Sequence, residues 1–192
     1  MMNEKRYVSA QELLNDSFEL GIRIFKSGFK PSFIIGVWRG GTPVAIAVQE
    51  ILDHFGIKTD HIAIRTSSYC AINKKNKRVR VHGLEYVMRH ANWKDGLLIV
   101  DDVWDSGKSI KTIIKTLKAK MRRNLPENIR IATPWYKPNH NATDLIPDYY
   151  IHETDRWLVF PHELEGLTLN EMFTNKPGMK RMFEEAGLAR HG

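Results

Sequence analysis

Residues 97–109, LLIVDDVWDSGKS, give the clearest indication of the fold class. This stretch begins with four apolar residues, which is typical of a strand buried in a parallel sheet, and then places two carboxylates side by side at Asp101 and Asp102. A turn of small and polar residues follows, and an amphipathic helix is predicted from about Lys108 to Arg123. Ligands bind at the carboxyl ends of strands in open α/β sheets, so this stretch predicts a site as well as a fold.

Strands and helices are predicted to alternate on both sides of this stretch. Ser9 and Glu12 fit a capping box that opens a helix ending near Lys26, and a second helix is predicted from Thr42, as its N-cap, to Phe55. This alternation favours an α/β fold with a mostly parallel, twisted sheet flanked by helices and joined by right-handed crossovers. The other predicted strands are residues 33–37, 59–65, 129–135, 149–152 and 157–160.

Length and composition narrow the class of protein. The 192 residues, 42% hydrophobic and 27% charged, suit a single domain over residues 1–192, with residues 170–192 as an appended helical tail. No apolar run approaches the ~20 residues of a membrane span, and the N-terminal residues lack the apolar stretch of a secretory signal. A single cysteine, Cys70, excludes an intrachain disulfide framework and a cysteine-rich zinc site. These features predict a cytoplasmic protein.

The charge balance favours anionic partners. Lys and Arg number 29 against 22 Asp and Glu, a net charge of +7, which suits nucleic acid, an anionic membrane face or phosphorylated small molecules. Positive charge is concentrated in residues 73–81. This run is interpreted as a solvated mobile loop, as a loop that closes over a phosphorylated substrate, or as a nucleic-acid contact. Its cations are Lys74, Lys75, Lys77, Arg78 and Arg80.

The turn after the acidic pair has the chemistry of a phosphate site. Small residues let backbone N–H groups converge at a helix N-terminus, and Ser106 and Ser109 add hydroxyl donors. The adjacent acids suit ribose hydroxyls or a metal held through the substrate. A Walker A loop is excluded, because it requires glycine where Asp102 stands. A phospho-acceptor domain and an ordinary capped turn are weaker alternatives, because neither needs so many acids and hydroxyls in so few residues.

Residues 100–109 resemble the phosphoribosyl-pyrophosphate (PRPP) signature of type I phosphoribosyltransferases. Other segments resemble, in family order, the pyrophosphate loop, the start of the mobile catalytic loop and the purine-binding segments. Together they narrow the resemblance to the purine branch, the bacterial xanthine-guanine and archaeal hypoxanthine-guanine enzymes. These segments are residues 36–43, 67–69, 137–138 and 157–161.

The resemblance implies a fold, a reaction and its partners. The fold would be that of type I phosphoribosyltransferases, with a small hood subdomain. The enzyme would transfer the 5-phosphoribosyl group from PRPP to a 6-oxopurine (hypoxanthine, guanine or xanthine), releasing pyrophosphate and a nucleoside 5′-monophosphate in purine salvage. It would use Mg²⁺ and form a homodimer or homotetramer, without a membrane or nucleic-acid partner.

The resemblance also implies roles for the residues of the PRPP site. Asp101 and Asp102 would engage the ribose hydroxyls and Mg²⁺, mostly through the substrate, and Glu163 is a further candidate for a metal contact. The Trp38–Arg39 peptide is the candidate for a non-proline cis bond that the family often has here. The other PRPP contacts would come from Arg39, Gly40, Ser68, Tyr69, Asp105, Ser106, Gly107, Lys108 and Ser109.

A second set of residues would recognise the base. Asp105 would be the catalytic acid–base group at the imidazole ring of the purine. Lys137 would hydrogen-bond the oxygen at position six, Trp157 would stack on the ring, and the backbone of Leu158 would read its opposite edge. The histidines at 82, 140, 152 and 162 show no ligand spacing and are expected to be structural.

Three departures from the family pattern lie in the phosphate sites. Ser106 and Ser109 stand where threonine is commoner, with Lys108 as an added charge between them, and Trp38 replaces a small residue. Two alternatives to the purine enzyme stay open. One is an RNA-binding regulator built on the same fold, and the other is a phosphoribosyltransferase for another base, such as orotate or uracil.

Overall fold

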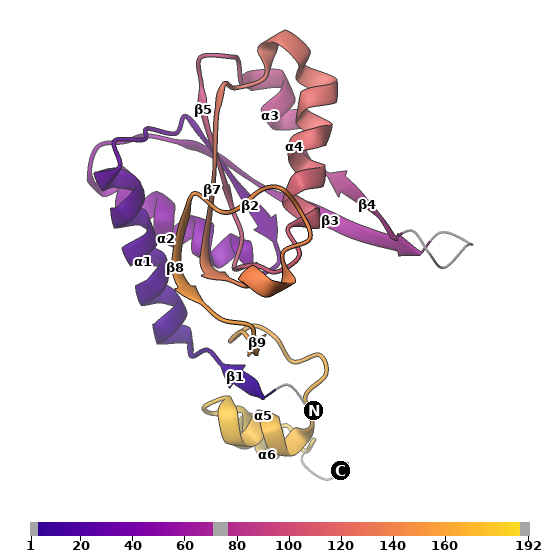
Figure 1. The fold of residues 1–192 in the computed structure, drawn as a ribbon. Coiled ribbons are helices and arrows are strands. Elements are labelled where there is room, and N and C mark those ends of the chain that lie inside the picture. Colours follow the sequence, from indigo (N-terminus) through magenta and orange to yellow (C-terminus); the bar gives the residue numbers. More distant parts are fainter. Residues whose placement is uncertain (1–3, 71–76, 189–192) are drawn as a thin grey trace. The chain divides into compact units, whose positions relative to one another are not determined.

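The computed structural model describes residues 4–70 and 77–188 (Figure 1). The chain forms two compact units. The larger unit is Leu14–Asp155, and the smaller one combines Met1–Leu13 with Arg156–Gly192. The expectation of a single domain over residues 1–192 stays a prediction. None of the helices in the described ranges is long and apolar enough to cross a membrane.

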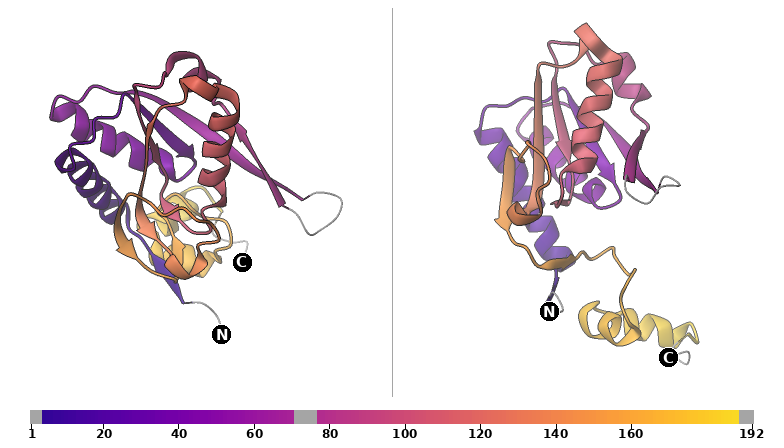
Figure 2. Two further views of the ribbon diagram at one scale, coloured as in Figure 1. Left: turned by 45° about the horizontal axis from the view of Figure 1, so that its top comes forward. Right: turned by 45° about the vertical axis from the view of Figure 1, so that its right-hand side comes forward.

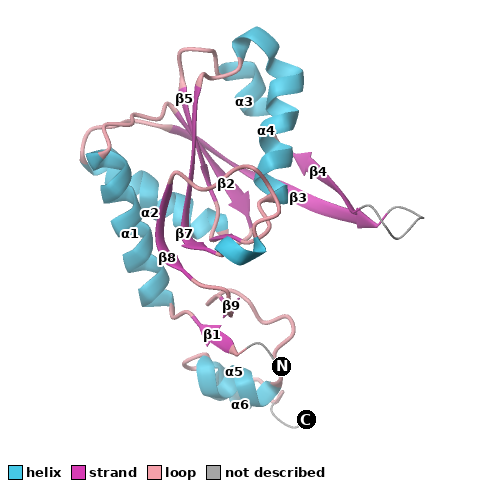
Figure 3. Ribbon diagram, viewed as in Figure 1, coloured by secondary structure: helices cyan, strands magenta, loops and turns pink. Residues whose placement is uncertain are grey.

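A seven-stranded sheet, counted over the described residues, is the centre of the larger unit (Figure 3). Its order is β4-β3-β2-β5-β7-β6, with β8 also paired to β7, and every pairing is parallel except that of β3 with β4. The α/β class and the mainly parallel sheet are therefore confirmed. The strands are β2 Phe33–Trp38, β3 Asp60–Cys70, β4 Lys77–His82, β5 Gly96–Val100, β6 Val103–Trp104, β7 Asn128–Tyr136 and β8 Tyr149–Glu153.

Helices cover both faces of this sheet (Figure 2). The helices α1 (Ala10–Lys26) and α2 (Gly41–His54) lie on one face, and α3 (Glu85–His90) and α4 (Lys108–Met121) lie on the other. The strands β2 and β5 are buried along almost their whole length, which explains their continuous apolar sequence. Two 3₁₀ turns, Arg122–Asn124 and Pro138–His140, follow α4 and β7.

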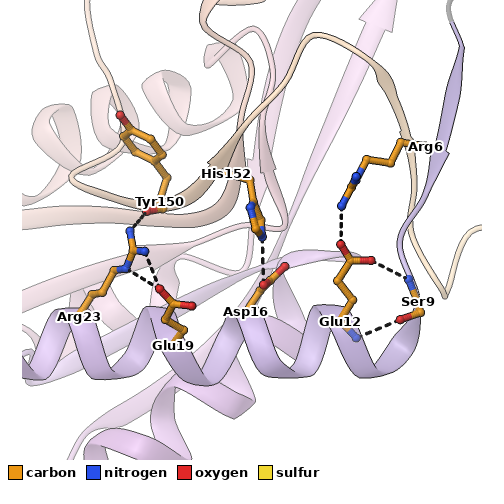
Figure 4. A network of polar contacts seen from close by, with 8 residues as sticks. All are labelled: Arg6, Ser9, Glu12, Asp16, Glu19, Arg23, Tyr150 and His152. Carbon is orange, nitrogen blue, oxygen red and sulfur yellow. Dashed lines mark hydrogen bonds and ion pairs between the residues drawn. The ribbon is translucent and has the colours of Figure 1, made fainter.

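Polar contacts lie along α1 (Figure 4). The predicted capping box is present, because the Glu12 backbone N–H donates to Ser9 Oγ at 3.0 Å and the Ser9 N–H donates to the Glu12 carboxylate. Further along the helix, Asp16 Oδ1 lies 3.0 Å from His152 Nε2, and the Arg23 guanidinium donates to a backbone carbonyl of β8 at 2.7 Å. These last two contacts attach the outer strand β8 to the helix.

The smaller unit pairs the two ends of the chain. The strand β1 (Lys5–Tyr7) runs parallel to β9 (Trp157–Val159), and the helices α5 (Leu169–Asn175) and α6 (Met179–Glu185) follow. Two contacts hold α5 within this unit. The Glu171 carboxylate accepts from Lys5 Nζ at 2.6 Å, and the buried Lys176 ammonium donates to the Phe160 carbonyl.

The structure corrects three expectations. Thr42 is not an N-cap, because α2 already begins at Gly41 and Thr42 lies in its first turn. Residues 77–81 form strand β4, paired with β3, instead of a loop, and the alternation of basic and β-branched residues from Arg78 to Val81 is the period-two pattern of a strand. Residues 67–69 likewise lie inside β3 and not in a loop. Lys74 and Lys75 lie outside the described residues.

Candidate active site

Three loops meet at the carboxyl-terminal edge of the sheet in the larger unit. They follow the adjacent parallel strands β2, β5 and β7, whose register places Gly36 beside Val100 and Val100 beside Ala132. The Asp101 N–H donates to the Ala132 carbonyl at 3.1 Å, and the Lys137 N–H donates to the Trp104 carbonyl at 2.9 Å. The sheet therefore brings together loops that are far apart in the sequence.

The loop after β2 lies directly against the acidic pair. The Trp38–Arg39 peptide is cis, as expected, and the Arg39 side chain is exposed. A Cβ atom on Gly40 would lie 1.7 Å from Asp102 Oδ2, and one on Gly41 would lie 2.5 Å from the Val100 carbonyl oxygen. With the Asp102 side chain and the end of β5 in these positions, only glycine at 40 and 41 leaves enough space for this approach.

The acidic pair concentrates negative charge at the end of β5. The Asp102 N–H donates to Asp101 Oδ1 at 3.0 Å, and the Asp102 side chain is buried. Burial, reinforced by the charge of Asp102, raises the pKa of Asp101 well above its usual value. Within the described part of the chain, no group of three or more His, Cys, Asp or Glu residues could hold a metal. Two carboxylates fit Mg²⁺ if substrate oxygens and water supply its other ligands.

The turn between β6 and α4 places small and hydroxyl-bearing residues at the N-terminus of a helix. Gly107 has φ of 72° and caps α4, and a Cβ atom there would lie 2.6 Å from the ring of Trp104. Trp104 is almost completely buried and forms the floor of the turn, a role that sequence reasoning missed. Ser106 and Ser109 are partly exposed, and Lys108 is exposed in the first turn of the helix. Backbone N–H groups and hydroxyls thus gather at a helix N-terminus.

Asp105 is held by two side chains of the loop after β7. The Lys137 ammonium lies 3.3 Å from Asp105 Oδ2, and His140 Nδ1 lies 3.1 Å from Oδ1. The Lys137 side chain is buried, whereas half of the Asp105 side chain is exposed. The structure therefore brings together Asp105 and Lys137, both predicted site residues, and adds His140. Its position three residues after Lys137, in the same short loop, is the sequence signal that could have identified it.

The remaining predicted residues belong to other elements. Ser68 and Tyr69 are in β3, paired with β4. Trp157 and Leu158 belong to β9 of the smaller unit, where Trp157 is exposed and Leu158 is buried. Glu163, also in that unit, accepts a hydrogen bond from the Phe160 N–H at 3.1 Å.

Comparison with known proteins places this geometry in context. Residues 5–165 match the family described as "Phosphoribosyl transferase domain". A purine phosphoribosyltransferase from Pyrococcus horikoshii Ot3 is 28% identical, with a TM-score of 0.69 over 85% of this chain and 97% of its own. No curated protein sequence matches the chain significantly.

Two more distant structures show the fold alone. A Helicobacter pylori xanthine-guanine-hypoxanthine phosphoribosyltransferase is 20% identical, with a TM-score of 0.62 over 82% of this chain and 92% of its own. A hypothetical protein from Neisseria gonorrhoeae with bound ppGpp is 19% identical, with a TM-score of 0.68 over 86% of this chain and 93% of its own.

Proposed function

The chain belongs to the family of phosphoribosyl transferase domains and is a phosphoribosyltransferase with the fold of the purine branch. We therefore propose that it transfers the 5-phosphoribosyl group from PRPP to a 6-oxopurine. The products are pyrophosphate and a nucleoside 5′-monophosphate, as purine salvage requires. The observation that carries the proposal is Asp105, a half-exposed carboxylate held by the buried Lys137 beside the turn between β6 and α4.

The phosphate side of the site suits PRPP. The turn from Ser106 to Ser109 would hold the 5′-phosphate, with Lys108 as an added cation. The loop containing Arg39 and Gly40 would receive pyrophosphate through its backbone N–H groups and the exposed guanidinium, and Ser68 and Tyr69 would complete the contacts. Displacement of pyrophosphate leaves positive charge on the ribose and negative charge on the leaving group. Fixed donors at the leaving group and carboxylates at the ribose stabilise that distribution.

Mg²⁺ is the cofactor of this proposal. Asp101 and Asp102 would hold it largely through oxygens of the substrate, which agrees with the crowded charge described above. The bound ion would neutralise part of the pyrophosphate charge. Glu163 is a further candidate ligand, and its carboxylate already accepts from a backbone N–H.

Three residues would select the base. Lys137 is a donor only, so it suits a carbonyl oxygen at position six and disfavours adenine, which has an amino group there. The exposed face of Trp157 suits stacking on a purine ring, and the Leu158 backbone would read the opposite edge. Asp105 would exchange the proton of the imidazole ring.

The test is release of pyrophosphate from PRPP and Mg²⁺ with hypoxanthine, guanine, xanthine, adenine and uracil assayed separately. We expect release with one or more 6-oxopurines and little with adenine or uracil. The variant Asp105→Asn, which keeps the shape of the side chain, should lose about 10²–10⁴-fold in kcat. Release with none of the bases, while PRPP still binds, would reject the proposal and favour a regulatory role. Sedimentation equilibrium would test the proposed homodimer or homotetramer.

A further inference from the structure

His140 completes a cluster in which both oxygens of Asp105 have a partner. Lys137 Nζ donates to Asp105 Oδ2 at 3.3 Å, and His140 Nδ1 lies 3.1 Å from Asp105 Oδ1. A carboxylate only accepts hydrogen bonds, so the imidazole must carry its proton on Nδ1 to make this contact. The two partners of Asp105 differ in their proposed roles, because Lys137 also binds the oxygen of the base, whereas His140 contacts only the carboxylate in this cluster.

The loop fixes the backbone of His140 on both sides. Pro138 begins the 3₁₀ turn, in which the His140 N–H donates to the Lys137 carbonyl at 3.2 Å. Asn139 donates to Asp155 through both its backbone and its side chain. The Ala142 N–H then donates to the Ser106 carbonyl at 3.1 Å, which joins the loop to the phosphate turn. The imidazole is therefore presented to Asp105 from a well-anchored backbone.

We propose that His140 is a positioning residue that holds Oδ1 of Asp105, so that Oδ2 is directed at the imidazole ring of the purine when Lys137 engages the base. This inference rests on the proposed function. The ring proton passes to Oδ2, and the electron pair stays in the purine. A ring nitrogen then bonds to C1 of the ribose, and pyrophosphate leaves with the electrons of the broken C–O bond. Without His140, a half-exposed carboxylate would rotate away from this geometry.

The kinetic test compares His140→Ala with His140→Asn, whose amide nitrogen can replace the Nδ1 donor. We expect His140→Ala to lower kcat about 10-fold with little change in the KM of the base, and His140→Asn to recover most of the loss. In an Asp105→Ala background, His140→Ala should have no further effect on the residual rate, because the two residues act as one unit. A wild-type kcat in His140→Ala, an Asn variant as poor as the Ala variant, or additive losses would each overturn the proposal.

A second measurement separates this inference from the proposed function. The ¹⁵N chemical shifts of the His140 ring report which nitrogen carries the proton, without any turnover. We expect the Nδ1–H tautomer in the unmodified protein and its loss in Asp105→Ala. If no base gives release of pyrophosphate, the proposed function and the role of His140 in it are rejected, whereas the contact between His140 and Asp105 is not. An Nε2–H tautomer that Asp105→Ala leaves unchanged would reject the contact even in an active enzyme.

Discussion

Gly40→Ala should mainly lower activity and Gly41→Ala should mainly lower stability, although the two glycines are adjacent. A Cβ atom on Gly40 meets a side chain, with Asp102 Oδ2 at 1.7 Å, whereas one on Gly41 meets backbone, with the Val100 oxygen at 2.5 Å and the Asp101 Cα at 2.7 Å. Neither glycine has a positive φ, so the effects are steric. A side chain can rotate away from a new methyl group, and the end of a central strand cannot.

The magnitudes follow from these distances. Ordinary contact begins at 3.4 Å, so in Gly40→Ala the Asp102 oxygen must retreat by about 1.7 Å. Misplacement by 1 Å can cost about 100-fold in rate, and we expect at least that loss in kcat/KM for PRPP, with the Tm little changed. In Gly41→Ala the overpacked backbone should cost about 1–3 kcal/mol of folding free energy, a fall in Tm of about 2–4 °C per kcal/mol.

The assay is pyrophosphate release with varied PRPP, paired with thermal unfolding of each variant. Gly36→Ala is the matched control, because its Cβ would lie 3.1 Å from the Ala45 side chain and away from the acidic pair. An unchanged kcat/KM for PRPP in Gly40→Ala would contradict the predicted displacement of Asp102, and so would a loss of Tm as large as that of Gly41→Ala.

Further predictions concern charge. Asp101→Asn should raise the Tm at neutral pH while weakening PRPP turnover. The unfolded chain releases the proton of Asp101 above its ordinary pKa of 3.8, whereas the folded protein, with a raised pKa, still holds it. The charged form of Asp101 therefore destabilises the fold as the pH rises, and the neutral amide of Asn removes that destabilisation. A Tm at neutral pH that is equal to or below that of the wild type would contradict this. The hydrogen bond from the Lys5 side chain, with those from Thr168, lowers the pKa of Glu171 to about 2. The contribution of Glu171 to stability is therefore present above pH 4.5 and is lost as the pH falls toward 2. The Tm difference between wild type and Glu171→Gln should therefore shrink on acidification, and a constant difference would argue against this contribution. Lys137→Gln should lower kcat/KM for 6-oxopurines by about 10–100-fold in the pyrophosphate assay, and an unchanged value would remove Lys137 from base recognition.

The sequence predicts the acidic end of β5 and the strands β2, β3, β5, β7, β8 and β9, because these features depend on local pattern. An apolar run followed by Asp101 and Asp102 carries its meaning within a few residues. The contact between Gly40 and Asp102 could not be predicted, because it depends on the pairing of β2 with β5 across a long stretch of chain.

Two other features were missed for related reasons. The strand β4 was hidden by its basic residues, whose charge favoured a loop over the period-two pattern beneath it. His140 was judged by metal-ligand spacing, whereas its partner, Asp105, lies 35 positions earlier in the chain.

The pairing of β1 with β9 has a consequence for synthesis of the protein on the ribosome. Residues 5–7 emerge before the whole of Leu14–Asp155, whereas their partners, residues 157–159, emerge after it. Chains fold from the N-terminus as they are made, so the larger unit can fold while β1 is still without its partner strand. A nascent chain would thus form the loops proposed to bind PRPP before the strand that carries Trp157 and Leu158, the residues proposed to contact the base, has been made.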